Sequence, residues 1–341
     1  MAANSKQPNI YDVARLAEVS HQTVSRVINN YQGMKPETRE RVELAMETLG
    51  YRPNLAARAL VTSKSNIVGI LASDTDFTGP ATVVHKLEKT ARKGGYFAIT
   101  ASIDPESPAS ITEGIDYLQK LGIEGLVVVT PQTTAVDIAR DRLRGVPVIT
   151  IDSMYRMDEH AVSMDNFAGA TAATNHLIDL GHSQIVHISG PKQWFETNAR
   201  ISGYSSAMLN ASLVPNIIDG DWSIDTGYRI GMQLNIDQPL TTAIFAANDY
   251  LAMGLLHAFR LRGISVPERL SIVGFDDLPE TPYYSPPLTT VRQDFETLGT
   301  RAMALLLETI NGHRHLGHDR LIPDLIIRDS TAAPSAYWRQ S

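Results

Sequence analysis

Three polar side chains lie close together in one short stretch, HQTVSRV, over residues 21–27. In a helix, His21, Gln22 and, one turn later, Arg26 would project from the first two turns. Glutamine can pair with the N6 and N7 edge of adenine, and arginine with the O6 and N7 edge of guanine. Each such pair discriminates between bases by about 1–3 kcal/mol. These residues therefore predict direct reading of bases in the major groove of DNA.

The surrounding residues predict three short helices, because apolar side chains recur at helical spacing in three segments. Asn9 and Asp12 form a capping pair for the first segment, and Ser20 can cap the second. Pro36 is well placed to start the third, and Gly50 to end it. The expected helices are 10–17, 20–29 and 36–49. Three helices around one small core, with a tight turn between the first two, predict a helix-turn-helix module; a small bundle with ordinary surface polar groups is the alternative.

The charge of the chain is unevenly distributed. The net charge is −7, but residues 1–64 carry +3 and the remainder carries −10. A basic segment is often only a charged surface exposed to solvent. Attraction to DNA phosphates nevertheless requires a positively charged segment of this kind. The chain has no cysteine, which excludes disulfides, thiolate metal sites and a cysteine nucleophile.

Beyond residue 65 the sequence alternates between apolar runs and helical stretches. The apolar runs are continuous and include NIVGILA, YFAITAS, GLVVVT, PVITID, QIVHISG, TAIFAA and LSIVGFDD. Continuous apolar strands that alternate with helices indicate parallel sheets covered on both faces. Helices are expected near 80–94, 110–121, 167–180, 200–211 and 249–263. The stretch is long enough for two doubly wound lobes, and the polar segments near 151–165 and 288–294 are candidate crossings between them.

Ligands of open α/β sheets bind at the carboxyl ends of strands, so the polar residues at those ends are binding candidates. Aromatic side chains can cover the apolar face of a sugar ring, while carboxylates, amides and a guanidinium pair with its hydroxyls. Trp222 is the candidate aromatic platform, with buried core packing as the alternative reading. Asp249 and Asp277 are interpreted as helix caps rather than ligand contacts. The remaining candidates for a sugar site are Ser73, Phe77, Asp152, Arg200, Asn248, Asp276 and Phe295.

The stretches IYDVARLAEVSHQTVSRVINN and KPETRERVELAMETLGYRPNLAARAL resemble the lactose-repressor (LacI/GalR) family over about fifty residues. The resemblance implies a hinge that folds into a short helix when two subunits meet on DNA. Within it, Asn54 would be the cap, Ala57 would face the minor groove and Leu60 would wedge into the central base step. This chain departs from the family with His21 where the best-known member has tyrosine, and with Lys35 where a capping serine is common.

The resemblance continues through GDWS, ANDYLAMG, SIVGFDD and PPLTTVRQDF, and implies a periplasmic-binding-protein-like core. It places Arg200, Asn248 and Asp276 at sugar-contacting positions and adds Gln293 to the residue-based candidates. Together the two lines of reasoning predict an N-terminal all-α helix-turn-helix DNA-binding module plus an α/β core of two doubly wound parallel-sheet lobes. The expected boundaries are 8–50 for the module, 51–64 for the hinge, 65–331 for the core and 332–341 for the tail. Within the core, lobe 1 would be 65–163 plus 294–322, and lobe 2 would be 165–292 plus 324–331.

We therefore expect a transcriptional repressor whose affinity for double-stranded, pseudo-palindromic operator DNA is set by a small sugar of the galactoside or glucoside class. The short polar tail lacks leucine heptads, which favours a homodimer. No signal peptide or membrane span is evident, so a cytoplasmic location is expected. No cofactor is expected, and the loop HRHLGHD is interpreted as surface rather than as a metal site. A solute-binding protein of a sugar transport system is the alternative, and a glycosidase is disfavoured because adjacent carboxylates at a strand end point apart.

Overall fold

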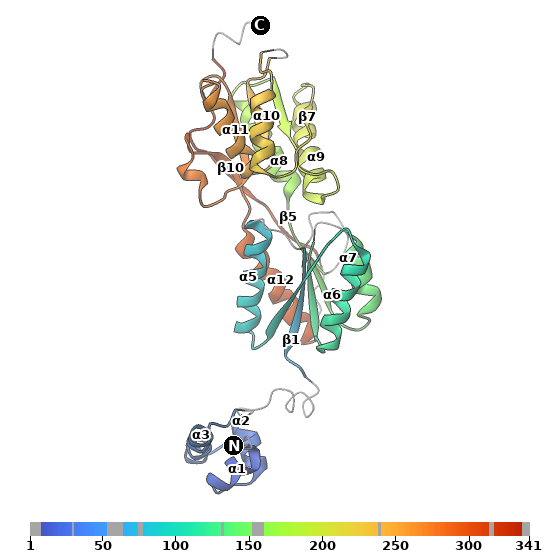
Figure 1. Cartoon of the computed structure of the whole chain (residues 1–341), viewed down its shortest axis with the longest axis vertical. Coiled ribbons are helices and arrows are strands. Elements are labelled where there is room, and N and C mark those ends of the chain that lie inside the picture. Colours follow the sequence, from blue (N-terminus) through green and yellow to red (C-terminus); the bar gives the residue numbers. More distant parts are fainter. Residues whose placement is uncertain are drawn as a thin grey trace, which may run out of the picture. The chain divides into compact units, whose positions relative to one another are not determined.

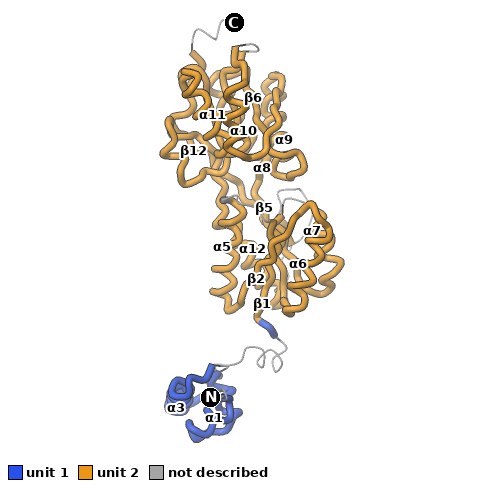
Figure 2. Tube along the Cα trace, viewed as in Figure 1, with its two compact units in different colours: residues 1–65 blue, residues 66–341 orange. Residues whose placement is uncertain are grey.

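The computed structural model describes residues 8–28, 31–52, 64–73, 78–130, 133–151, 160–237, 240–313 and 317–335. The chain divides into two compact units, residues 1–65 and 66–341 (Figure 2). None of the described helices is long and apolar enough to cross a membrane.

The small unit consists of three helices, as predicted: α1 (Ile10–Leu16), α2 (His21–Ile28) and α3 (Pro36–Leu49). Val13, Val24 and Val42 are fully buried, one from each helix, and they form the centre of its core. The predicted capping box between Asn9 and Asp12 is present at the start of α1. At the other end of the unit, Gly50 ends α3 in the left-handed conformation that glycine adopts without strain.

The turn between α1 and α2 sets the start of the predicted reading helix. The Oγ of Ser20 accepts a hydrogen bond from the Thr23 N–H at 3.1 Å, so the expected cap of α2 is confirmed. Lys35, at the N-cap position of α3, makes no side-chain capping bond. The missing cap costs about 1 kcal/mol, and Pro36 offsets part of it by fixing the first helical φ angle.

In the large unit, lobe 1 is a six-stranded parallel sheet in the order β11-β5-β4-β3-β1-β2. Helices α5 and α12 pack on one face through a core that includes Leu87 and Met303, while α6 and α7 cover the other through Ile115 and Ala139 (Figure 1). The strands are β1 (Ile67–Ser73), β2 (Phe97–Ile103), β3 (Gly125–Val129), β4 (Val148–Ile151), β5 (Ala161–Met164) and β11 (Asp319–Leu321). The helices are α5 (Thr78–Lys93), α6 (Pro108–Lys120), α7 (Thr133–Arg142) and α12 (Phe295–Ile310).

Lobe 2 repeats the arrangement, with the order β12-β10-β9-β8-β6-β7 and only β12 antiparallel to its neighbour. Helices α8 and α9 pack around Tyr204 on one face, and α10 and α11 pack around Phe259 on the other. The strands are β6 (Ile185–Ile188), β7 (Asn216–Ile218), β8 (Ala243–Ala246), β9 (Ser271–Asp276), β10 (Thr289–Arg292) and β12 (Asp324–Ile326). The helices are α8 (Asn166–Asp179), α9 (Phe195–Asn210), α10 (Ile224–Gln233), α11 (Asp249–Leu261) and the 3-10 turn Thr281–Tyr283.

The chain crosses between the lobes three times: between β5 and α8, between β10 and α12, and between β11 and β12. Each lobe is therefore assembled from separated stretches of sequence, and the predicted fold class is confirmed. One predicted element was wrong in its start. The helix expected from residue 200 begins at Phe195, and Thr197 in its first turn is already buried.

Candidate functional sites

The predicted reading residues lie on α2. His21, Gln22 and Arg26 are all exposed, whereas Val24 and Val27 on the opposite side are buried in the core of the small unit. The apolar side thus fixes the rotation of α2 and leaves its polar side open to solvent. The hinge candidates Asn54, Ala57 and Leu60 lie outside the described residues.

A pocket in the large unit is lined by residues of both lobes. It encloses about 960 Å³ of empty space, part of it open to solvent, which lies in the range of pockets for small organic ligands. Phe77 and Asp152 lie outside the described residues. All the other predicted ligand-binding residues line this one pocket: Ser73, Arg200, Trp222, Asn248, Asp276, Gln293 and Phe295.

Arg200 is the buried centre of the lobe 2 wall. Its side chain is 4% exposed, and its guanidinium lies 3.8 Å from the centroid of the Phe275 ring. The Nε donates to the Asn166 Oδ1 at 2.8 Å, and one terminal nitrogen donates to the Ala247 carbonyl oxygen. Burial lowers the pKa of Arg200, while the carboxylates of Asp276 and other acids act in the opposite direction. Packing and hydrogen bonds thus hold the guanidinium in one orientation.

The carboxylate of Asp276 faces Arg200 across the pocket wall. The Oδ1 of Asp276 lies 3.5 Å from the Nη2 of Arg200. The same oxygen accepts a hydrogen bond from the Gln293 Nε2 at 2.7 Å. Burial raises the pKa of Asp276, and the Arg200 charge and the Gln293 hydrogen bond oppose that rise. Asp276 has a φ of 113°, a conformation that costs free energy for a side chain other than glycine. The carboxylate is therefore held by its surroundings rather than by its local backbone preference.

Trp222 is both buried and part of the pocket wall, so the two readings offered for it are compatible. It has a φ of 71°, and its carbonyl accepts a hydrogen bond from the Asn248 Nδ2 at 3.0 Å. Its ring covers Gly190, where any Cβ would overlap the indole. The indole Nε1 has no hydrogen-bond partner among the described residues. A ligand with an acceptor atom in this pocket could therefore satisfy a buried donor.

Asn248 also caps a helix. Its Oδ1 accepts a hydrogen bond from the Leu251 N–H at 2.9 Å at the start of α11.

The expectation that Asp249 and Asp277 cap helices is wrong. Asp249 is the first residue of α11, but its carboxylate accepts from the Leu278 N–H at 2.9 Å and the Thr290 hydroxyl at 2.6 Å. These bonds tie α11 to the loop that follows β9 and to β10.

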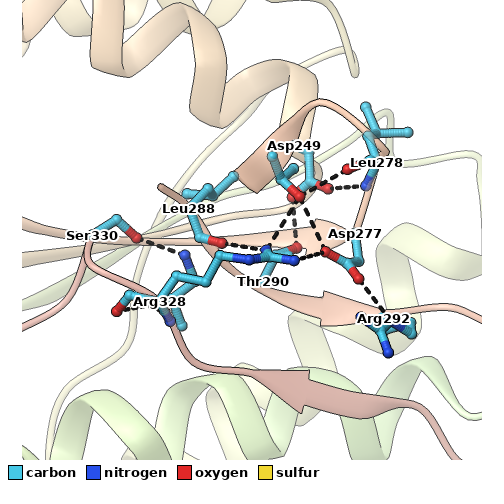
Figure 3. A network of polar contacts seen from close by, with 10 residues as sticks. Asp249, Asp277, Leu278, Leu288, Thr290, Arg292, Arg328 and Ser330 are labelled. Carbon is cyan, nitrogen blue, oxygen red and sulfur yellow. Dashed lines mark hydrogen bonds and ion pairs between the residues drawn. The ribbon is translucent and has the colours of Figure 1, made fainter. Parts of the chain in front are cut away.

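Asp277 lies in the same polar network (Figure 3). Its carboxylate accepts from Arg328 and from Arg292, each at 2.7 Å, and from the Thr281 hydroxyl at 3.0 Å. Burial alone would raise the pKa of Asp277, but the hydrogen bonds and charge of the two arginines outweigh it and lower the pKa below 3.8. Burial and the neighbouring Asp276 carboxylate raise the pKa of Asp249 well above that value. The network holds the end of β9, next to Asp276, from outside the pocket.

The lobe 1 wall of the pocket is mainly apolar. Phe295, at the start of α12, covers Gly79 of α5, where an added Cβ would meet the ring at 2.8 Å. Ser73, at the end of β1, contributes a buried hydroxyl without a partner among the described residues. The other described lobe 1 residues of this wall are Pro80, Val83, Val129, Thr130, Ile151, Met164 and Leu298.

Five polar or aromatic lining residues were not predicted from the sequence: Thr130, Asn166, Trp194, Glu196 and Tyr250. Asn166 follows the end of β5, so the strand-end rule that selected the others could have found it. Glu196 precedes Arg200 by four residues on α9, and the two therefore share one helix face. The four-residue spacing was overlooked because the helix was predicted to begin at residue 200, which left Glu196 outside it.

Comparison with known proteins agrees with this architecture. The family model described as bacterial regulatory proteins, lacI family, matches residues 9–54, and a periplasmic binding protein-like domain matches residues 174–331. The HTH-type transcriptional repressor PurR of Haemophilus influenzae is 32% identical over 332 residues, covering 94% of this chain and 98% of the relative. The fold is that of an N-terminal helix-turn-helix domain followed by a two-lobed α/β core with parallel sheets. The chain belongs to the lacI family of bacterial regulatory proteins.

Two solved structures extend the comparison. The lac repressor dimer bound to operator and the anti-inducer ONPF has a TM-score of 0.89 and 29% identity, covering 96% of this chain and all of that one. The complex of the transcriptional regulator CelR with cellobiose has a TM-score of 0.70 and 28% identity, covering 95% and 99%. These relatives are transcriptional regulators rather than enzymes.

Proposed function

We propose that this chain is a sequence-specific DNA-binding transcriptional repressor whose operator affinity is controlled by a small sugar in the pocket of the large unit. His21, Gln22 and Arg26 read bases in the major groove. Their exposure on α2 supports this role, as does the operator-bound dimer among the similar structures. A homodimer would present two such helices to a pseudo-palindromic site.

Each expected segment of the chain has its own proposed function. Residues 8–50 bind DNA, 51–64 form the hinge, 65–331 bind the sugar and hold the dimer together, and 332–341 form a tail. In the hinge, Asn54 caps a short helix, Ala57 faces the minor groove and Leu60 wedges between base pairs. Such a protein acts in the cytoplasm, where operator DNA is found.

The sugar assignment depends on one observation: an indole ring and a set of fixed hydrogen-bonding groups share one pocket wall. Trp222 offers an apolar surface, and Arg200 and Asp276 form a preorganised pair beside it. Sugars combine an apolar ring face with hydroxyls that donate and accept, so this wall suits a galactoside or glucoside. The cellobiose complex of CelR supports the class.

Both lobes line the pocket. A ligand that contacts both lobes therefore stabilises some arrangements of lobe 1 relative to lobe 2 more than others. If only one arrangement allows the hinge to bind DNA, sugar and operator are coupled, and each changes the affinity of the other by the same factor. A solute-binding protein would share the large unit, but the base-reading unit has no role in transport.

The test combines ligand screening with operator binding. Thermal unfolding against a panel of galactosides and glucosides should give a stabilising hit, and that sugar should change operator affinity. Arg26→Ala should weaken specific binding by about tenfold or more, since a bidentate base contact contributes about 1–3 kcal/mol of discrimination. An equal loss of affinity for all DNA sequences would assign Arg26 to phosphate contact instead.

A further inference from the structure

Tyr31 is an exposed aromatic residue beside the proposed reading helix. It lies just after α2, and the residue is 54% exposed. The core of the small unit and the side chains packed against it do not include Tyr31, whereas they do include Tyr51. Burial in the core therefore does not account for its aromatic ring.

The ring of Tyr31 is placed between two neighbours. The guanidinium carbon of Arg26 lies 5.6 Å from the ring centroid, within the range of a cation–π contact. A Cβ added at Gly33 would meet the Tyr31 ring at 2.7 Å, so the glycine allows the ring to lie close to the backbone.

The backbone holds the same arrangement. The Tyr31 N–H donates to the Arg26 carbonyl oxygen at 2.9 Å, and the Arg39 guanidinium donates to the Tyr31 carbonyl oxygen at 3.1 Å. Tyr31 is thus fixed relative to Arg26 by its main chain as well as by its ring.

We propose that Tyr31 is a positioning residue for base recognition: its ring restrains the Arg26 guanidinium before DNA is bound. An exposed arginine samples many rotamers, and ordering it on DNA costs entropy. A ring that restricts those rotamers in the free protein lowers that cost and favours the one base pair that Arg26 reads. The inference rests on the proposed reading of DNA by α2.

The experiment selects DNA from a random double-stranded pool with the full-length chain at one fixed salt concentration, and compares base preference position by position. The unsubstituted chain should select a two-fold related motif, and Arg26→Ala should erase preference at one position in each half. Tyr31→Leu keeps an apolar side chain but removes the ring. It should reduce preference at that same position, with a two- to fivefold loss in affinity for the selected site.

Three controls separate positioning from other roles. Tyr31→Phe keeps the ring without the hydroxyl and should behave as the unsubstituted chain; a loss equal to that of Tyr31→Leu would mean direct contact by the hydroxyl and would overturn the inference. Tyr31→Leu should have no further effect in the Arg26→Ala background, and a further loss there would also overturn it. Tyr117→Leu, at a residue 52% exposed in the large unit, should change nothing.

Two further outcomes count against the inference. An unchanged profile for Tyr31→Leu would remove Tyr31 from base recognition. An equal loss at every position, with a lower unfolding temperature of the small unit, would assign it a structural role. If the unsubstituted chain selects no motif at all, the proposed function itself fails, and this result is distinct from a normal motif that Tyr31→Leu leaves intact.

Discussion

Lobe 1 and lobe 2 have corresponding strand orders, and each places an aromatic ring over a glycine at the pocket. Their walls nevertheless differ in chemistry. Lobe 2 supplies Arg200, Asp276 and Asn248, each held by hydrogen bonds to other protein groups. Lobe 1 supplies mostly apolar side chains around Phe295.

The difference indicates separate tasks for the two lobes. A polar group that is already hydrogen-bonded and buried can fix the orientation of a ligand at little entropic cost. The hydrophobic effect at an apolar wall is not directional, so the wall stabilises any ligand whose apolar surface it removes from water. We therefore expect lobe 2 to determine which sugar binds, and lobe 1 to contribute affinity with less selectivity.

The largest effect is expected from Arg200→Ala in lobe 2. The substitution leaves Asp276 buried without its cation, which should lower the free energy of unfolding by about 3–5 kcal/mol and abolish the sugar response. Arg200→Lys keeps the charge but cannot reproduce the Nε donor to Asn166, so it should not restore the response. Chemical denaturation and sugar titration measure the two effects.

Lys192 provides a matched control. It lies just before the start of α9, and its ion pair with Asp219 is exposed, with side-chain exposures of 68% and 63%. Lys192→Ala should change stability by no more than about 1 kcal/mol and leave the response intact. A retained response in Arg200→Lys at normal affinity would contradict the orienting role of lobe 2.

A second test uses pH and the network around Asp277. The pKa of Asp277 is lowered in the folded protein, so its carboxylate stabilises the fold at pH values above its ordinary value of 3.8. That contribution is lost as the pH falls through the lower folded pKa. Asp277→Asn should cost about 1–3 kcal/mol at neutral pH, and the loss should shrink in acid. Denaturation curves at several pH values measure this dependence.

Asp319 of lobe 1 is the corresponding control, since its ion pair with Arg301 is longer, at 3.6 Å, and more exposed. Asp319→Asn should show only a small effect at neutral pH. Equal effects of the two substitutions would contradict the larger contribution expected from the lobe 2 network around Asp277.

The smallest expected effects come from the two glycines under the aromatic rings. Gly190→Ala would displace Trp222, whose backbone is already constrained, and should weaken sugar binding by about tenfold, as expected for overpacking of 1–3 kcal/mol. Gly79→Ala would displace only the tip of Phe295 and should weaken it by a few-fold. Tryptophan fluorescence and sugar titration report both changes, and a larger effect at Gly79 would reverse the assignment of the two walls.

The small unit was predictable because its signals are local. Capping residues, helical spacing and the glycine stop all lie within one turn of the feature they determine, and α1, α2 and α3 begin and end close to the predicted residues. In the large unit the same kind of reasoning identified strand ends and hence most of the pocket. It misplaced the start of α9 and therefore missed Glu196, because a helix start without a capping side chain leaves a weak local signal.

The sequence by itself determined the fold class, the strands β1 to β4, β6, β8 and β9, and the residue types at their ends. Only the tertiary structure decided how those residues interact. Ser73 and Phe295 line one pocket although more than two hundred residues separate them. The positive φ angles of Trp222 and Asp276 cost free energy for residues other than glycine. Contacts between segments far apart in the chain stabilise these conformations, and such contacts leave no periodic pattern in the sequence.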